Sequence, residues 1–212
     1  MSLFNRFSQI SRKRKLETFF ELVKQKNAIK VLDVGGAIEN SSQLFELFPY
    51  KNNISVINIS EEDIRAISKA YPEVDARVGD ACNLPWPDKY FDIVYSNAVI
   101  EHVGDFGRQQ KMASEIIRVG KRWFVTTPNR WYPFEFHMRL PFVTWLPFHG
   151  YLKFGSLICF NHVKRKYVFG QKIDHLRLMT ANELRVCFPG SRIIKQRVTF
   201  MPETLIAIGE KV

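Results

Sequence analysis

Two short turns, each directly after an apolar run, constrain this chain more than any other feature. The first is Asp33-Val34-Gly35-Gly36, which ends a run that begins at Ile29. The second is Gly79-Asp80-Ala81, which follows the run from Val74 to Val78. Short apolar runs bounded by such turns are typical of buried strands, and glycine lets a backbone approach a ligand closely. The two turns together predict strand ends that gather around a ligand.

Strand and helix patterns alternate along most of the chain. Ser60 predicts a helix N-cap, and Thr180 with Glu183 predicts a capping box. We expect strands over 29–34, 54–59, 74–78, 91–96 and 123–127, an antiparallel pair over 193–200 and 203–209, and helices over 16–23, from Ser41 or Ser42 to Leu47, 61–70, 108–119 and 180–188. Such alternation implies an α/β domain with a parallel, doubly wound sheet.

Polar and small residues stand where the predicted parallel strands end. Ligands of such sheets bind outside the carboxyl ends of the strands, at the point where the strand order reverses. The candidate ligand-binding residues at these ends are Asp33, Gly35, Gly36, Asn58, Ile59, Asp80, Ala81, Asn97 and Val99.

The same segment resembles a known enzyme family. Gly79-Asp80-Ala81, Leu84-Pro85, Pro87-Asp88, Phe91-Asp92 and Glu101-His102 are similar to the pattern of class I methyltransferases that include ubiquinone and menaquinone biosynthesis enzymes. The run from Thr127 to Pro141 resembles a branch often found with bacterial cell-surface polysaccharide genes. The resemblance implies S-adenosylmethionine (SAM) as cofactor and a Rossmann-like sheet of seven strands in the order 3-2-1-4-5-7-6, with the last strand antiparallel.

The resemblance also assigns roles to the cofactor residues. The turn at Gly35 and Gly36 would approach the methionine part of the cofactor, and Asp80 with Ala81 would meet the adenine ring. Asn58 stands where the family usually carries an acid that holds the ribose hydroxyls. The chain departs from the family there, and also at Ala37 and Glu39, where two further glycines are usual. These departures predict a weakened cofactor site as one alternative.

We expect a single domain over residues 1–212. Within it, residues 128–175 differ from the rest in amino-acid composition. Aromatic residues are dense in this segment, and acids are scarce. Because it is too long and apolar for a simple loop, we interpret it as a substrate lid inserted after the fifth strand. His102, Glu135 and His137 are the catalytic candidates, since imidazole and carboxylate groups transfer protons near neutral pH. For each of them a structural role is the alternative.

Composition bounds the partners and the location. The net charge of +10 favours an anionic partner, and the aromatics of 131–169 with nearby bases suit a peripheral membrane contact. Cys82, Cys159 and Cys187 are widely spaced and form no CxxC pair, so we expect no disulfide framework, no metal site and a reducing cytoplasm. Peripheral contact with the inner membrane surface is the other location left open.

The predicted function is transfer of a methyl group from SAM to an oxygen, with nitrogen and carbon less favoured. The acceptor would be a small molecule or lipid-linked: a sugar, a glycan or a quinone-like lipid. The alternatives are an RNA methyltransferase, favoured by the basic charge, and a binding module of the same fold with a weakened cofactor site. Nucleic acid is the less favoured partner, because no RNA-binding motif accompanies the aromatics. The oligomeric state is not predicted.

Overall fold

A computed structural model describes residues 3–23, 29–48, 51–161, 164, 166–170 and 176–210; of residues 3–8, 39–43, 148 and 149 it describes the backbone. The first half of the described chain contains α1 (Leu3–Val23), β1 (Val31–Val34), α2 (Ile38–Leu47), η1 (Lys51–Asn53), β2 (Ile54–Asn58), α3 (Glu61–Ala70), β3 (Asp75–Val78), β4 (Ile93–Asn97), η2 (Ile100–His102) and α4 (Phe106–Val119). The second half contains β5 (Arg122–Pro128), β6 (Phe134–Glu135), β7 (Leu140–Pro141), η3 (Val143–Trp145), α5 (Phe148–Leu157), β8 (Ile158–Asn161), β9 (Lys166–Phe169), α6 (Ala181–Cys187), β10 (Arg192–Arg197) and β11 (Pro202–Glu210).

The main sheet has seven strands in the order β10-β11-β5-β4-β1-β2-β3. The strands from β3 to β5 pair in parallel, and β11 runs antiparallel to both β5 and β10. With β10 as the sixth strand and β11 as the seventh, this is the expected order, 3-2-1-4-5-7-6, so the predicted fold class is confirmed. The order reverses between β1 and β4, which marks the expected ligand edge.

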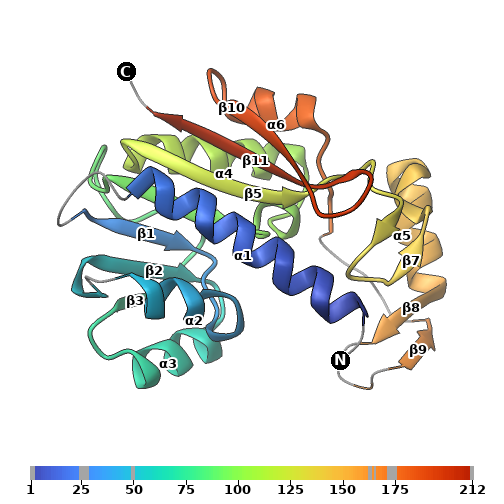
Figure 1. Ribbon diagram of the computed structural model, residues 1–212, viewed down its shortest axis with the longest axis horizontal. Coiled ribbons are helices and arrows are strands. Elements are labelled where there is room, and N and C mark those ends of the chain that lie inside the picture. The colour runs from blue at the N-terminus through green and yellow to red at the C-terminus, as the bar shows by residue number, and fades with distance from the viewer. Residues whose placement is uncertain are drawn as a thin grey trace.

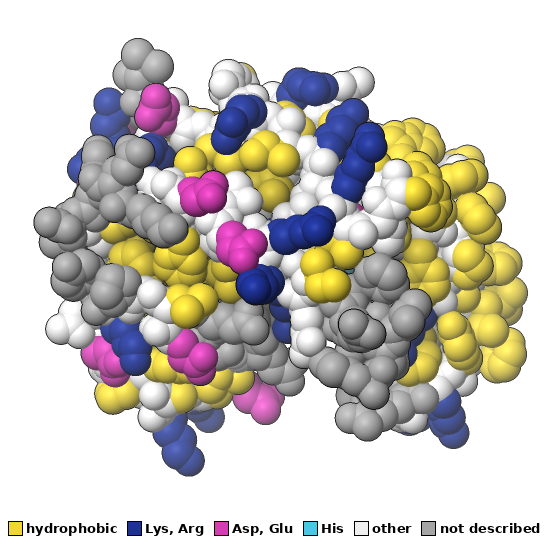
Figure 2. Space-filling view, viewed as in Figure 1, with side chains coloured by type: hydrophobic (Ala, Val, Ile, Leu, Met, Phe, Trp, Pro, Cys, Tyr) yellow, Lys and Arg dark blue, Asp and Glu magenta, His cyan; other side chains and the backbone are white. Residues whose placement is uncertain are grey.

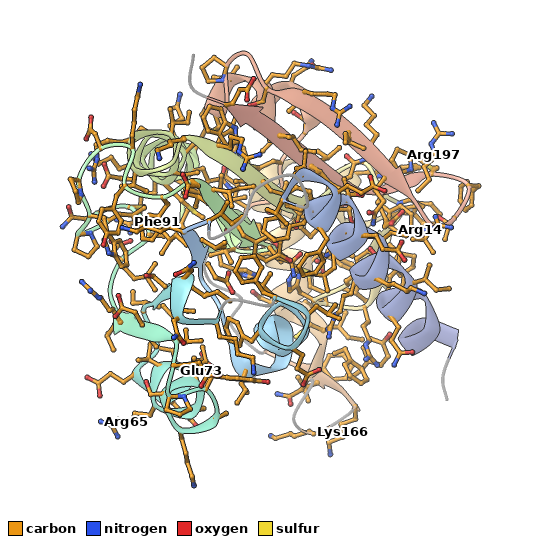
Figure 3. All side chains as sticks on the ribbon, turned by 60° about the vertical axis from the view of Figure 1, so that its left-hand side comes forward. Arg14, Arg65, Glu73, Phe91, Lys166 and Arg197 are labelled. Carbon is orange, nitrogen blue, oxygen red and sulfur yellow. The ribbon has the colours of Figure 1, made fainter. Side chains whose placement is uncertain are left out.

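Two hydrophobic cores cover the two faces of the sheet. One contains buried residues of α4 and α6, such as Ile116 and Leu184, and the other contains those of α1, α2 and α3, such as Phe19 and Ile67. Figure 1 shows α1 crossing the near face of the sheet, with α4 and α6 on the far face. Arg14 of α1 reaches the carbonyl oxygen of Arg197 in β10 at 2.5 Å, and Figure 3 shows these two residues side by side.

Local sequence signals explain where α3 and α6 begin. The Ser60 side chain accepts a hydrogen bond from the amide of Asp63, and Thr180 with Glu183 forms the predicted capping box. The predicted start of α2 at Ser41 or Ser42 is wrong, because the helix begins at Ile38 with Ala37 as its N-cap. Helix α1 also begins well before the predicted Leu16.

The segment between β5 and α6 forms a separate small unit at one end of the sheet (Figure 1). It contains the hairpins β6–β7 and β8–β9 and the helix α5. Its own hydrophobic cluster is made of Met138, Leu140, Val143, Tyr151, Cys159, Leu176 and Leu178. Residues 162, 163, 165 and 171–175 of the predicted lid lie outside the described residues, and closure over a substrate stays a prediction.

Candidate functional site at the carboxyl edge of the sheet

The glycine turn after β1 requires glycine at both positions. Gly35 has φ of +78°, and its amide donates to the carbonyl oxygen of Ile57 at 2.7 Å. A Cβ atom on Gly35 would lie 2.4 Å from Cγ2 of Val99, and one on Gly36 would lie 2.6 Å from Oδ2 of Asp33. Because there is no room for either atom, the turn packs directly against Val99 on one side and the buried Asp33 on the other.

The turn leads into the N-terminus of α2. Ala37, the N-cap residue, makes no side-chain hydrogen bond to the first turn of this helix. The first amides of a helix have no partner within it, so an uncapped N-terminus suits an anionic or hydroxyl group of a ligand. The side chain of Glu39, which the sequence sets near this position, lies outside the described residues.

Asn58, at the end of β2, is tied to the same turn. Its Nδ2 donates to the carbonyl oxygen of Gly36 at 2.8 Å, and its Oδ1 accepts from the amide of Ser60 at 2.9 Å. An amide can make both bonds, whereas the acid usual in the family has no donor for the Gly36 oxygen. The neighbouring Ile59 is 77% exposed, so an apolar side chain stands open at this edge of the sheet.

Asp80, after β3, is held by a residue of α4. Its Oδ1 accepts from the amide of Cys82 at 2.8 Å, and its Oδ2 accepts from Arg108 at 2.9 Å. These two bonds lower the pKa of Asp80, so its carboxyl group is ionised at neutral pH. Ala81 packs against the core beside it.

Asn97, at the end of β4, binds a lysine that was not among the candidate residues predicted from the sequence. Lys15 of α1 is buried and donates from Nζ to Oδ1 of Asn97 at 2.7 Å; Thr126 donates to the same oxygen at 2.8 Å. Burial lowers the pKa of Lys15 to about 8, although the charge of Glu101 opposes this shift. The sequence does contain a sign of this burial. Lys15 stands four residues before the buried Phe19, so the two side chains lie on the same face of the helix.

The three catalytic candidates meet in one cluster. The rings of His102 and His137 lie edge to face with centroids 4.8 Å apart, and Nδ1 of His137 is 2.7 Å from Oε1 of Glu135. The other oxygen of Glu135 accepts from the amide of Met138. Sequence reasoning missed Glu101, which is fully buried beside the histidines and accepts from Thr127 Oγ1 at 3.0 Å.

Burial sets the protonation of this cluster. Partial desolvation lowers the pKa of His102 to about 4, and the charge of His137 adds to the effect, although His102 as a whole is an exposed residue. Burial opposes charge on His137 too, but its hydrogen bond to Glu135 and the charge of that carboxylate outweigh the burial and raise the pKa of His137. Burial raises the pKa of Glu101. The cluster thus holds one neutral imidazole next to one that is stabilised in its charged form.

Known proteins resemble this chain in sequence and in fold. Residues 32–123, which run from β1 into β5, match the family model described as a methyltransferase domain. The sequence of residues 32–123 is thus similar to that of methyltransferase domains. The PH0226 protein of Pyrococcus horikoshii has the same fold, with a TM-score of 0.62 at 18% identity over 95% of this chain and 90% of that one.

Two curated relatives are similar in sequence to part of this chain. A probable SAM-dependent methyltransferase of Mycolicibacterium smegmatis is 34% identical over 35% of this chain and 29% of its own length. Ajmaline N-methyltransferase of Rauvolfia serpentina is 34% identical over 45% of this chain and 33% of its own length. The matches therefore span about a third of the length of these relatives.

Proposed function

We propose that the protein is a SAM-dependent methyltransferase that binds its cofactor across the ends of β1, β2 and β3. The observation that carries the proposal is the contact network of the Gly35–Gly36 turn, which touches both Asn58 and Val99. The uncapped start of α2 and the exposed Ile59 flank this network, and Asp80 follows the next strand. These residues fit a ligand with a polar aminoacyl end, a ribose and an apolar ring.

The acceptor atom that we propose is a hydroxyl oxygen. SAM supplies an electrophilic methyl group on a sulfonium when it is bound. The oxygen gains this methyl group, the C–S electron pair stays on sulfur to give S-adenosylhomocysteine, and the hydroxyl proton must go to a base. The adjacent rings of His102 and His137, with Glu135 behind them, support such a proton transfer. Ajmaline N-methyltransferase acts on nitrogen by its name, so our choice of oxygen rests on the histidine cluster.

The acceptor class that we propose is a molecule at a lipid surface, such as a lipid-linked sugar or quinone. Large apolar side chains are exposed on the unit between β5 and α6, namely those of Trp131, Phe142, Trp145, Phe154 and Leu157. Figure 2 shows apolar side chains gathered at this end of the molecule. The single acid of residues 131–169 is Glu135, which is buried, so no exposed acid opposes anionic lipid there.

The proposed location is the cytoplasm with peripheral contact at the membrane. No helix among the described residues is both long and apolar enough to cross a bilayer. Binding would therefore be interfacial, through aromatic rings flanked by exposed bases such as Lys153 and Lys164.

Calorimetric titration with SAM and with S-adenosylhomocysteine tests the cofactor assignment. We expect one cofactor to bind per chain, and we expect Asp80→Ala to weaken this binding. Asp88→Asn should leave it unchanged, because the exposed carboxylate of Asp88 pairs with Arg118. Absence of binding to the wild-type chain would favour the alternative of a binding module with a lost cofactor site.

Sedimentation with vesicles tests the lipid assignment. We expect the protein to bind vesicles of phosphatidylcholine with phosphatidylglycerol more strongly than pure phosphatidylcholine. Trp145→Ala and Phe154→Ala should weaken this binding, whereas Val186→Ala, an equally exposed apolar position on α6, should not. Equal losses in all three variants, or binding to neither vesicle, would refute the lipid surface.

A further inference from the structure

Glu101, His102 and His137 converge although they come from two distant parts of the chain. Glu101 and His102 belong to η2, directly after β4, and His137 lies in the turn between β6 and β7. Each offers one ligand atom, and these atoms all lie within 4.8 Å of one another. We propose that the three side chains bind one divalent transition-metal ion.

Glu101 provides the strongest argument for a cation. Its side chain has no exposed surface, and its Oε1 has no hydrogen-bond partner among the described residues. Thr127 satisfies the other oxygen, and Lys15, although close enough to act electrostatically, donates to Asn97 instead. A buried carboxylate is costly unless it is paired or coordinates a metal. A bound cation would supply the missing partner.

His137 is oriented as metal-binding histidines are. Glu135, itself 2% exposed, sits 2.7 Å from Nδ1 of His137 and is fixed by the amide of Met138. In metal sites the ligating histidine commonly donates its second nitrogen to a carboxylate, which sets the ring orientation and raises its basicity. The same contact here holds the ring of His137 beside that of His102, with the ring centroids 4.8 Å apart.

The donor set indicates the kind of ion. Two imidazoles and one carboxylate suit zinc, manganese or iron(II), and they leave coordination positions for water or substrate. Ligands that bind one ion at about 2.0–2.2 Å lie about 3–3.5 Å from one another. A separation of 4.8 Å therefore has to shorten by about 1.3–1.8 Å. Rotation of the exposed His102 side chain can supply this change.

The ion also has a consequence for the chemistry, and this step rests on the proposed function. A divalent ion that coordinates a hydroxyl oxygen lowers the pKa of that hydroxyl. With the ion bound, His102 and His137 would hold the metal and would no longer be free to accept the hydroxyl proton. That proton would instead pass to solvent before the oxygen accepts the methyl group. The acceptor would thus be a metal-chelating alcohol, phenol or sugar.

Metal titration of the full-length, chelator-treated protein tests the site without any methyl transfer. The probes are Zn²⁺ and Mn²⁺ by calorimetry and Co²⁺ by its visible absorption, which reports coordination by protein nitrogen. We expect one ion per chain. Glu101→Gln and His137→Ala should weaken binding at least tenfold, and Glu135→Gln should do so less. Glu62→Gln, which removes an exposed carboxylate from α3, is the matched control and should bind as wild type does.

The outcomes separate this inference from the proposed function. Wild-type protein that binds no ion, or a His102→Ala/His137→Ala variant that binds as tightly as wild type, overturns the metal site. Thermal unfolding of each variant shows whether it is folded; if Glu101→Gln does not fold, the double histidine variant and the Co²⁺ spectrum decide. SAM binding that persists with chelator present leaves the cofactor assignment intact when the metal site fails.

Discussion

Substitution of Gly35 by alanine measures how closely the glycine turn packs against Val99. Gly35 has φ of +78°, and the added Cβ would lie 2.4 Å and 2.6 Å from the two methyl carbons of Val99. Gly190 has nearly the same backbone, with φ of +76°, but an added Cβ would meet nothing within 4 Å. The two glycines therefore form a matched pair that differs in packing and shares the backbone cost.

The magnitudes follow from these two contributions. A left-handed conformation costs a residue with a Cβ atom about 1–2 kcal/mol, so Gly190→Ala should lower the free energy of unfolding by that amount. Overpacking adds about 1–3 kcal/mol, so Gly35→Ala should cost about 2–5 kcal/mol in total. Val99→Ala removes the clashing methyl groups, and in the Gly35→Ala background it should recover part of this loss.

Urea unfolding of five proteins, followed by far-ultraviolet circular dichroism, provides the free energies. The five are the wild type, Gly35→Ala, Gly190→Ala, Val99→Ala and the Gly35→Ala/Val99→Ala double variant. The interaction energy between positions 35 and 99 should be favourable in the double variant, by about 1 kcal/mol or more. Equal losses in Gly35→Ala and Gly190→Ala, with no recovery from Val99→Ala, would refute the close packing of the turn on the β4–η2 connection.

Three further predictions concern the same site and its support. Asn58→Asp removes the side-chain amide that donates to the carbonyl oxygen of Gly36. The variant should therefore lose about 1 kcal/mol of unfolding free energy and should bind SAM more weakly in calorimetry. Tighter binding would show that the acid is accommodated as in the family. His102→Ala should lower methyl transfer far more than SAM affinity, measured by S-adenosylhomocysteine release against calorimetry; equal turnover would make the ring structural. Arg118 lowers the pKa of Glu115 in the folded protein. Ionised Glu115 therefore adds to the free energy of unfolding above its unfolded pKa of about 4.3, and this contribution is lost as the pH falls through the lower, folded pKa. In Glu115→Gln the free energy of unfolding, measured with urea, should decrease less as the pH is lowered than it does in the wild type. An unchanged pH dependence would contradict this prediction.

Much of the fold is predictable because its signals are local. The apolar runs that end at Asp33 and Asn58 become β1 and β2, and the capping residues Ser60 and Thr180 begin α3 and α6. The start of α2 was missed because Ala37 caps it without a side-chain hydrogen bond, so no serine or threonine marks it.

The site was less predictable because its contacts are long-range. His102 and the Glu135–His137 pair were predicted from residue type and position, and the structure brings them together. Glu101 was missed, since a glutamate next to a histidine gives no sign that it is fully buried. Lys15 was not predicted as a site residue, because its burial depends on where α1 crosses the sheet, and no local pattern determines that crossing.

Calorimetric titration of SAM into wild-type protein, Asp80→Ala and Asp88→Asn tests the central claim most directly. The account predicts one cofactor per wild-type chain. It predicts affinity about 5- to 150-fold lower in Asp80→Ala, from the loss of a charged hydrogen-bond partner worth about 1–3 kcal/mol. Asp88→Asn should bind as wild type does. Unchanged affinity in Asp80→Ala, or no SAM binding by the wild-type chain, would contradict a cofactor site at the carboxyl edge of this sheet.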